Sequence, residues 1–350
     1  MESESTFLKS WSIVIASLIY CYFIPSKIPK GKIRLISILP VVSIFTILPL
    51  LHTPFYMQFH LGACIAWFAN FKLLLFAFGK DDTLSVNPSM SLLHFIILTA
   101  LPVKVKHNTP RKPKNIESLG LPKFPLTFVV NALIWSVTIQ VYMSYKHHPL
   151  ITNPIIVHIL YTARLFFGLQ VHLELLAALA RLFLGRQEIE KQFNKPHLST
   201  SLQDFWGRRW NLTVSALLKS AIHEPTKSFF TPKLGNRCAL HLAIIATYAV
   251  SGLMHEVMYF YVGRRWPTWE VMWFFVIHGV CLSTEIEVKR IACRKGWKLH
   301  PGISLILTAG FVMTTAIWLC FAELIHCGVH VREIEEYIVL FRYIRDNLRS

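Results

Sequence analysis

The sequence is organised around one stretch, which begins Phe193-Asn-Lys-Pro-His-Leu-Ser-Thr-Ser-Leu-Gln-Asp-Phe-Trp-Gly-Arg-Arg-Trp-Asn211 and ends Ser251-Gly-Leu-Met-His-Glu-Val-Met-Tyr-Phe260. Its first part is basic and rich in tryptophan, whereas its last part carries His255 and Glu256 in an otherwise apolar segment. Ionisable side chains in such a segment are costly to bury and need a compensating partner. The pair is therefore a candidate functional site, provided that the segment lies in a membrane.

The composition indicates a polytopic membrane protein. Of the 350 residues, 53% are hydrophobic and 16% are charged, and the mean hydropathy is +0.45. This is too apolar for a soluble protein of this length. The seven cysteines are scattered and form no Cys-x-x-Cys pair, so we expect neither a disulfide framework nor a zinc site. Glu2 and Glu4 replace the basic start of a signal peptide, so the first apolar run is expected to remain in the membrane.

Eight apolar runs are long enough to cross a bilayer. They cover residues 7–24, 33–51, 55–78, 124–145, 151–184, 238–262, 269–286 and 303–325. The apolar run 92–103 is too short to span and is expected to be re-entrant or interfacial. The run 151–184 is long for one crossing, so one tilted helix and two shorter helices both remain open. We therefore expect an all-α membrane protein of about eight transmembrane helices, forming a single domain over residues 1–350.

Positive charge predicts the orientation in the membrane. Connections 25–34, 79–123, 185–237 and 289–300 hold 25 of the 36 Lys and Arg residues, and basic connections face the cytosol. Both termini would then be lumenal. The segment 185–237 would be a cytosolic or interfacial loop that carries the motif, followed by helices over 238–325 that include the His255 segment. The sequon Asn211-Leu-Thr213 would stay unmodified on the cytosolic side.

The net charge of +17 has a simple explanation in basic cytosolic connections that face anionic membrane lipids. Basic residues beside aromatic ones in a membrane protein are weak evidence for nucleic acid, and we expect no nucleic-acid partner.

The motif segment concentrates side chains that can bind a ligand. These are Asp204, Trp206, Arg208, Arg209, Trp210 and Asn211. One interpretation is an interfacial helix with tryptophan anchors and snorkelling arginines. The other is ligand capture, in which the arginines bind phosphates through paired hydrogen bonds and Asn211 donates its amide to a carbonyl oxygen. Composition alone leaves both interpretations open.

His255 alone is also ambiguous. A lone histidine in an apolar helix is more often a hydrogen-bonded structural residue, but an imidazole can also take a proton from an alcohol as a general base. Glu256 points about 100° away on a helix and could orient a partner or pair with an arginine. A multi-pass transporter that uses His255 and Glu256 as a proton relay is the alternative from another functional class.

The segments 193–196, 201–212 and 251–256, together with 69–78, 101–104 and 277–281, resemble the plant wax synthase branch of the membrane-bound O-acyltransferase superfamily. The likeness covers nearly the whole chain. It implies an integral membrane enzyme of the endoplasmic reticulum that moves an acyl group from acyl-CoA to a lipid hydroxyl.

The resemblance also assigns residues. It implies that His255 is the active-site histidine and that Asn211 is the second signature residue. Asp204 and Trp210 match the Asp and Trp ahead of that Asn in sterol and diacylglycerol acyltransferases, and Glu256 follows the His there as well. His197 departs from the wax synthase pattern, where a tyrosine is expected.

The sequence and the resemblance together predict an acyl-CoA-dependent O-acyltransferase that forms wax esters from a long-chain fatty alcohol. We expect His255 to act as general base with Asn211 assisting, without a covalent acyl-enzyme and with no metal or cofactor beyond the cosubstrate acyl-CoA. The residues expected to bind the substrate or acyl-CoA are Asp204, Trp206, Arg208, Arg209, Trp210 and Glu256. A sterol or diacylglycerol acceptor, acetyl-CoA as donor, and the oligomeric state remain open.

Overall fold

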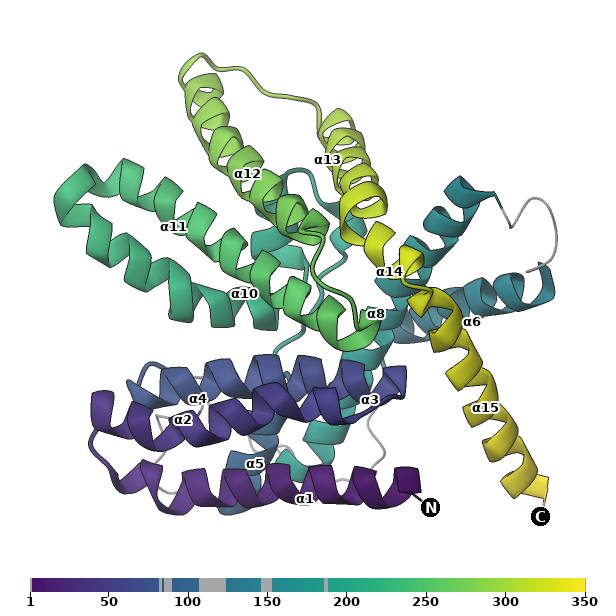
Figure 1. The fold of residues 1–350 in the computed structure, drawn as a ribbon. Helices are drawn as coiled ribbons and strands as arrows, with labels where there is room; N and C mark the ends of the chain where they lie inside the picture. Colours follow the sequence, from purple (N-terminus) through teal and green to yellow (C-terminus); the bar gives the residue numbers. More distant parts are fainter. Residues whose placement is uncertain are drawn as a thin grey trace, which may run out of the picture.

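The computed structural model describes residues 2–81, 84, 90–106, 124–145, 153–185 and 188–349, which form an assembly of helices (Figure 1). The longer helices are α1 (Glu2–Phe23), α2 (Lys32–Ile47), α6 (Leu126–Tyr145), α8 (Pro154–Leu184), α11 (Glu224–Gly263), α12 (Glu270–Arg294), α13 (Pro301–Thr315) and α15 (Val329–Arg349). The shorter ones are α3 (Phe55–His60), α4 (Asn70–Ala77), α5 (Leu92–Ala100), α9 (Leu202–Asp204), α10 (Leu212–Leu218) and α14 (Ala322–His326). Single π-helical segments continue several of them, over Leu61–Ala69, Phe205–Arg209, Lys219–His223 and Ala316–Cys320.

Eight helical segments of the described chain are long and apolar enough to cross a membrane, which confirms the expected number. Their bounds are Thr6–Lys27, Lys32–Leu51, Phe55–Ala77, Leu126–Met143, Ile155–Leu184, Leu212–Gly263, Glu270–Arg294 and Pro301–His326. The long run ending at Leu184 is one continuous helix, α8, and its expected start at Ile151 lies outside the described residues. Both ends of the described chain lie at the lower right of the view (Figure 1).

The short apolar run forms the nine-residue helix α5, which packs against α1 and α8. The last carbonyl groups of a helix have no partner within the helix. Here the buried ammonium of Lys72, on α4, donates to the carbonyl oxygens of Leu101 and Val103 at 2.8 and 3.0 Å, and also to that of Leu98. Lys72 therefore holds the end of α5 against α4.

The expected loop over 185–237 is largely helical, which corrects the sequence prediction. The motif itself forms α9 and the following π-helical segment, and α10 begins directly after it. The chain bends sharply at Gly235, whose φ of +76° is a conformation that glycine adopts without steric cost (Figure 1). The burial of Thr213, Leu217 and Leu218 on one face explains α10, and the basic residues on either side of it, Arg209 and Lys219, lowered the hydropathy of this stretch of sequence.

Two carboxylates each join a helix to the N-terminus of another helix that is distant in the sequence, by accepting the free backbone N–H groups there. Glu285 on α12 accepts the backbone N–H groups of Leu202 and Gln203, at 2.7 and 3.3 Å. Glu336 on α15 does the same for the start of α3, at 2.6 and 2.9 Å. Carboxylates are stabilising at this end of a helix because the orphan N–H groups and the helix dipole both favour negative charge. The motif segment is thereby positioned by α12.

The contact between α11 and α12 depends on Gly252, which precedes His255 by less than one turn. A Cβ atom at this position would lie 3.1 Å from the Cα atom of Met272 and 2.7 Å from its sulfur. Small residues let membrane helices approach closely, so the glycine sets the distance between the two helices.

Replacing Gly252 by alanine is therefore expected to destabilise the fold by about 1–3 kcal/mol through overpacking. Gly310 on α13 is the matched control, because a Cβ atom there meets nothing within 4 Å, and alanine is intrinsically the better helix former. Thermal unfolding in detergent should show a lower midpoint for Gly252→Ala only. Equal midpoints for the two variants would contradict the packing argument.

Candidate active site

One large cavity of about 860 Å³ lies between α3 with its π-helical continuation, α8, the motif segment and helices α10 to α15. Most side chains that line it are apolar or aromatic, and a few polar groups project among them. Its volume is near the upper end of the roughly 300–1,000 Å³ found for ligand sites. The cavity therefore suits a long apolar ligand with one reactive polar group.

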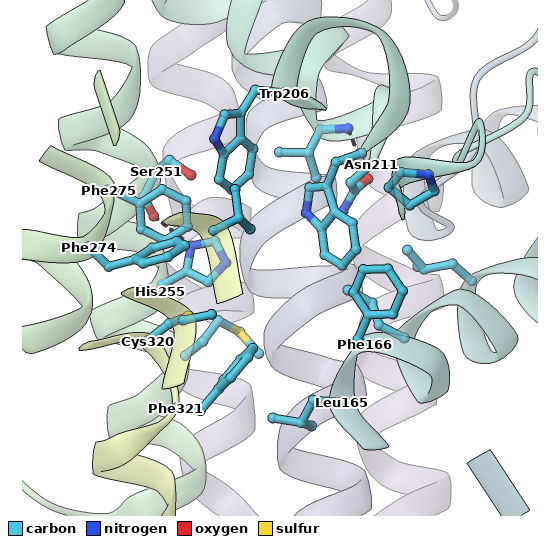
Figure 2. A pocket seen from close by; sticks show the side chains of 18 of the residues that line it. Leu165, Phe166, Trp206, Asn211, Ser251, His255, Phe274, Phe275, Cys320 and Phe321 are labelled. Atoms are coloured by element: carbon cyan, nitrogen blue, oxygen red, sulfur yellow. Dashed lines mark hydrogen bonds between the residues drawn. The ribbon is translucent and has the colours of Figure 1, made fainter. Parts of the chain in front are cut away.

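His255 lines this cavity from α11, one turn after Ser251. Its Nδ1 atom lies 2.7 Å from the backbone carbonyl oxygen of Ser251 (Figure 2). A carbonyl oxygen only accepts, so this hydrogen bond places a proton on Nδ1 and leaves Nε2 of the neutral ring as an acceptor. The ring is held edge-on to Trp67 at 4.9 Å and against Phe275 at 4.4 Å between ring centroids. The imidazole is thus oriented with its basic nitrogen available for proton transfer.

The hydrogen bond by itself does not distinguish His255, because His60, His172 and His278 make the same bond to the carbonyl group four residues earlier. His278 is absent from the cavity lining, while His60 and His172 line it. The Nε2 atom of His172 is already 3.2 Å from the hydroxyl of Tyr337. His255 differs from His60 and His172 because its ring contacts Phe275, which also contacts Trp206 of the motif segment (Figure 2).

Asn211 lines the cavity from the start of α10, on a wall separate from that of His255 (Figure 2). Its backbone is left-handed, with φ +37° and ψ +63°, a conformation that asparagine tolerates better than most residues. Its Oδ1 atom accepts the backbone N–H of Val214 at 3.3 Å and so caps α10. Because an N–H group only donates, the oxygen must face Val214, and the Nδ2 donor is left to point elsewhere.

An aromatic layer supports this wall. Trp210 stacks on Phe166 and Phe205 with ring centroids 5.2 and 5.5 Å apart. Trp206 meets Phe275 at 5.9 Å, the same ring that contacts His255. Both tryptophans line the cavity, so the structure brings Trp206, Trp210, Asn211 and His255 together.

The remaining predicted site residues do not line the cavity. Glu256 is 2% exposed, and its carboxylate accepts the backbone N–H of Met272 at 3.0 Å near the start of α12. Asp204 binds Arg209 through a 2.6 Å contact to Nε, and Arg209 also donates to the carbonyl oxygen of Lys195. Arg208 is exposed. The structure thus uses Glu256, Asp204 and Arg209 in internal contacts that shape the site rather than in its lining.

The sequence reasoning missed several lining residues that come from distant segments. Trp67 and Phe275 contact His255 itself, and Lys219 and His223 bring polar groups into the cavity from the segment after α10. Phe275 precedes the segment 277–281 noted in the sequence, but an aromatic residue in a membrane helix carries no functional signal by itself. Only packing places these side chains beside the two motif residues.

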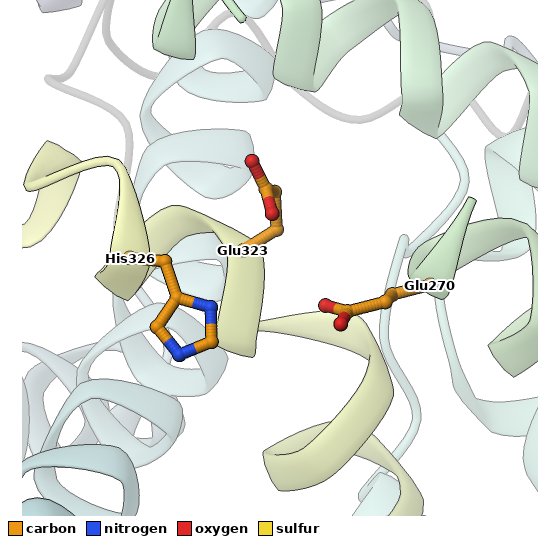
Figure 3. Close-up of side chains that lie close together, drawn as sticks. All are labelled: Glu270, Glu323 and His326. Atoms are coloured by element: carbon orange, nitrogen blue, oxygen red, sulfur yellow. The ribbon is translucent and has the colours of Figure 1, made fainter. Parts of the chain in front are cut away.

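Outside the cavity lining, Glu270, Glu323 and His326 could hold a metal ion, because one potential ligand atom from each lies within 4.8 Å of the others (Figure 3). Glu323 also accepts the thiol of Cys327 at 3.0 Å. Carboxylate oxygens and imidazole nitrogens are ordinary ligands for divalent cations. Because these side chains do not line the cavity, the group is separate from the His255 site.

The two functions of the Asn211 amide can be separated by mutation. Aspartate keeps the capping oxygen but lacks the Nδ2 donor, whereas alanine removes both. We expect both variants to lose about 10²-fold or more in turnover, which is the usual effect of deleting a donor to a developing oxyanion. Only Asn211→Ala should also lose about 0.5–2 kcal/mol of stability, because the helix cap is gone. Turnover in detergent and thermal unfolding measure the two effects, and an active Asn211→Asp protein would show that the donor is unnecessary.

Comparison with known proteins supports an acyltransferase family. The model of the membrane bound O-acyl transferase family matches residues 189–277, which include Asn211 and His255. The long-chain-alcohol O-fatty-acyltransferase of Simmondsia chinensis is 40% identical over 355 residues, covering 99% of this chain and 98% of that protein. Acyl-CoA--sterol O-acyltransferase 1 of Arabidopsis thaliana is 38% identical over 336 residues, covering 96% and 95%. Probable long-chain-alcohol O-fatty-acyltransferase 8 of the same plant is 38% identical over 351 residues, covering 100% and 99%.

Proposed function

This chain belongs to the membrane bound O-acyl transferase family, and we propose that it forms wax esters by moving the acyl group of a fatty acyl-CoA to the hydroxyl of a long-chain fatty alcohol. The observation that carries the proposal is that His255 and Asn211 line one apolar cavity, while hydrogen bonds within the protein engage the Nδ1 atom of His255 and the Oδ1 atom of Asn211. The chain is an acyltransferase of the membrane, and its relatives favour acyl transfer over the proton relay of a transporter.

The chemistry follows from the two polar groups. The Nε2 atom of His255 takes the proton of the alcohol as its oxygen attacks the thioester carbonyl. The carbonyl oxygen becomes an oxyanion, which the Nδ2 group of Asn211 stabilises by a preorganised hydrogen bond. Collapse of this intermediate breaks the carbon–sulfur bond, and the imidazolium returns the proton to the departing thiolate. An ester and CoA are the products, and no covalent acyl-enzyme is formed.

The aromatic and aliphatic lining suits both the acyl chain and the alcohol chain, which can enter from the bilayer. The phosphates of CoA have to remain in water, so the donor is expected to approach from the cytosolic side. We place this reaction in the endoplasmic reticulum membrane. A sterol acceptor is the second candidate, since one relative with 38% identity is named for that reaction.

Ester formation tests the proposal directly. Microsomes from cells without endogenous neutral-lipid acyltransferases would express the protein and receive hexadecanol, a sterol or diacylglycerol, each with palmitoyl-CoA or acetyl-CoA. Mass spectrometry of the lipid products should show hexadecyl palmitate as the main ester. A dominant sterol or diacylglycerol ester would reassign the acceptor, and the absence of every ester above the empty-vector control would overturn the proposal.

A further inference from the structure

A second, smaller cavity of about 220 Å³ lies between α4, the segment after α5 and the helix that starts with α10. Four lysines line it, Lys72, Lys80, Lys104 and Lys219. Two carboxylates, Asp81 and Glu224, also line it, so the ammonium groups exceed the carboxylates by two. A cavity with this surplus of positive charge favours an anionic ligand.

The lysines are held in different ways. Lys72 donates to three backbone carbonyl groups and provides a fixed charge. Lys104 lies 3.5 Å from Glu190, and Lys219 lies 4.0 Å from Glu224, which are loose contacts at solvent-accessible positions. Such ion pairs contribute little to stability, so the side chain of Lys219 can turn to an incoming anion. Lys80 is exposed and can do the same.

A buried hydroxyl points to a ligand independently of the charges. Thr213 lines the small cavity and is 5% exposed, and its Oγ1 atom has no hydrogen-bond partner among the described residues. Leaving a buried hydroxyl without a partner costs free energy. A phosphate oxygen in the cavity would accept this hydrogen bond and remove the cost.

The small cavity is adjacent to the large one, because Lys219 lines both. Thr213 and Asn211 lie two residues apart at the start of α10. Thr213 lines the small cavity and Asn211 lines the large one. A ligand with an anionic head and an acyl arm would occupy both cavities. A free lipid headgroup would share the phosphate chemistry, but its chains would remain in the bilayer.

We propose that this lysine cavity, with the Thr213 hydroxyl, binds phosphate groups of the CoA part of the acyl donor. The assignment rests on the proposed function for its donor, and it adds the residues that hold the donor outside the reacting centre. Lys80 and Lys219 supply movable charge, Lys72 supplies fixed charge, and Thr213 donates a hydrogen bond.

The test compares donors with and without phosphates in purified protein in neutral-lipid nanodiscs. Lys80→Gln/Lys219→Gln and Thr213→Val would be assayed with palmitoyl-CoA and with S-palmitoylpantetheine. We expect the KM for palmitoyl-CoA to rise about 5-fold or more, with kcat nearly unchanged, as for the loss of contacts made equally in the ground and transition states. The KM for S-palmitoylpantetheine should not change. Lys295→Gln/Lys298→Gln, which replaces two exposed lysines outside both cavities, is the charge-matched control for the double variant.

A binding measurement keeps the inference independent of turnover. CoA without an acyl chain should raise the unfolding midpoint of the wild type, since a ligand that binds only the folded state stabilises it, and this shift should shrink in the variants. Thr213→Val alone should be at least as stable as the wild type without ligand, because it removes the unpartnered hydroxyl. Equal KM changes for both donors, or a CoA shift that survives in the double variant, would overturn the assignment.

Repeating the assay with anionic lipid in the nanodiscs separates the two sources of phosphate. A KM effect that depends on the lipid rather than on the donor would reassign the cavity to headgroups and overturn the proposal. Wild-type protein that makes no ester but loses its CoA shift in the variants would refute the proposed function while supporting this site.

Discussion

Replacing His255 by glutamine is expected to lower kcat for ester formation by about 10²- to 10⁴-fold, the range for removing a general base. Glutamine keeps a polar side chain of similar reach, but its amide does not take up the alcohol proton. The measurement is product formation per mole of purified enzyme at saturating donor and acceptor.

His172→Gln is the matched control for this variant. His172 lines the same cavity and makes the same Nδ1 hydrogen bond to the carbonyl group of the preceding turn, at 2.7 Å. Its Nε2 atom contacts the hydroxyl of Tyr337. We expect turnover within about tenfold of the wild type, since no proton-transfer step is lost. A His255→Gln protein as active as the control, at equal abundance, would remove His255 from the chemistry.

The second large effect concerns stability. Arg164 on α8 and Glu333 on α15 form an ion pair of 3.0 Å, with side chains only 3% and 5% exposed. The same guanidinium group donates to the backbone carbonyl of His330 and lies over the ring of Tyr161 at 4.7 Å. Burial raises the pKa of the Glu333 carboxyl, and the Arg164 charge opposes this rise. The pair therefore ties α15 to α8 at the edge of the cavity, where both residues are among the lining.

Glu333→Gln is expected to cost about 3–5 kcal/mol, because it leaves the arginine charge buried without its partner. The double variant Arg164→Met/Glu333→Leu should be more stable than the single variant, since no uncompensated charge remains. Unfolding in detergent, followed by tryptophan fluorescence, measures both changes.

The chain offers an exposed ion pair for comparison. Lys106 and Glu188 are 3.3 Å apart, with side chains 48% and 58% exposed. Glu188→Gln should change stability by less than about 1 kcal/mol, as for other solvent-exposed pairs. If Glu333→Gln were as mild as this control, or if the double variant were the least stable of the series, the buried pair would not be what fastens α15.

The predicted site divides in a physically consistent way. Trp206, Trp210, Asn211 and His255 line the cavity, whereas Asp204, Arg209 and Glu256 meet backbone groups or each other. All seven stand in the same recognisable motifs, so their proximity in sequence did not separate those that line the site from those that shape it. The separation follows from the direction of each side chain on its helix and from the helix that faces it.

The amino-acid sequence by itself determined the membrane class, the eight long apolar segments and the two motif residues of the site. This was possible because bilayer thickness sets the length of a spanning helix, and because the two segments that carry Asn211 and His255 resemble those of a known family. Only the tertiary structure decided that the expected loop is helical, that Glu256 caps α12, and that lysines from α4, the α5 connection and the segment after α10 surround one small cavity. These features depend on contacts between residues far apart in the chain, which hydropathy and local spacing leave undetermined.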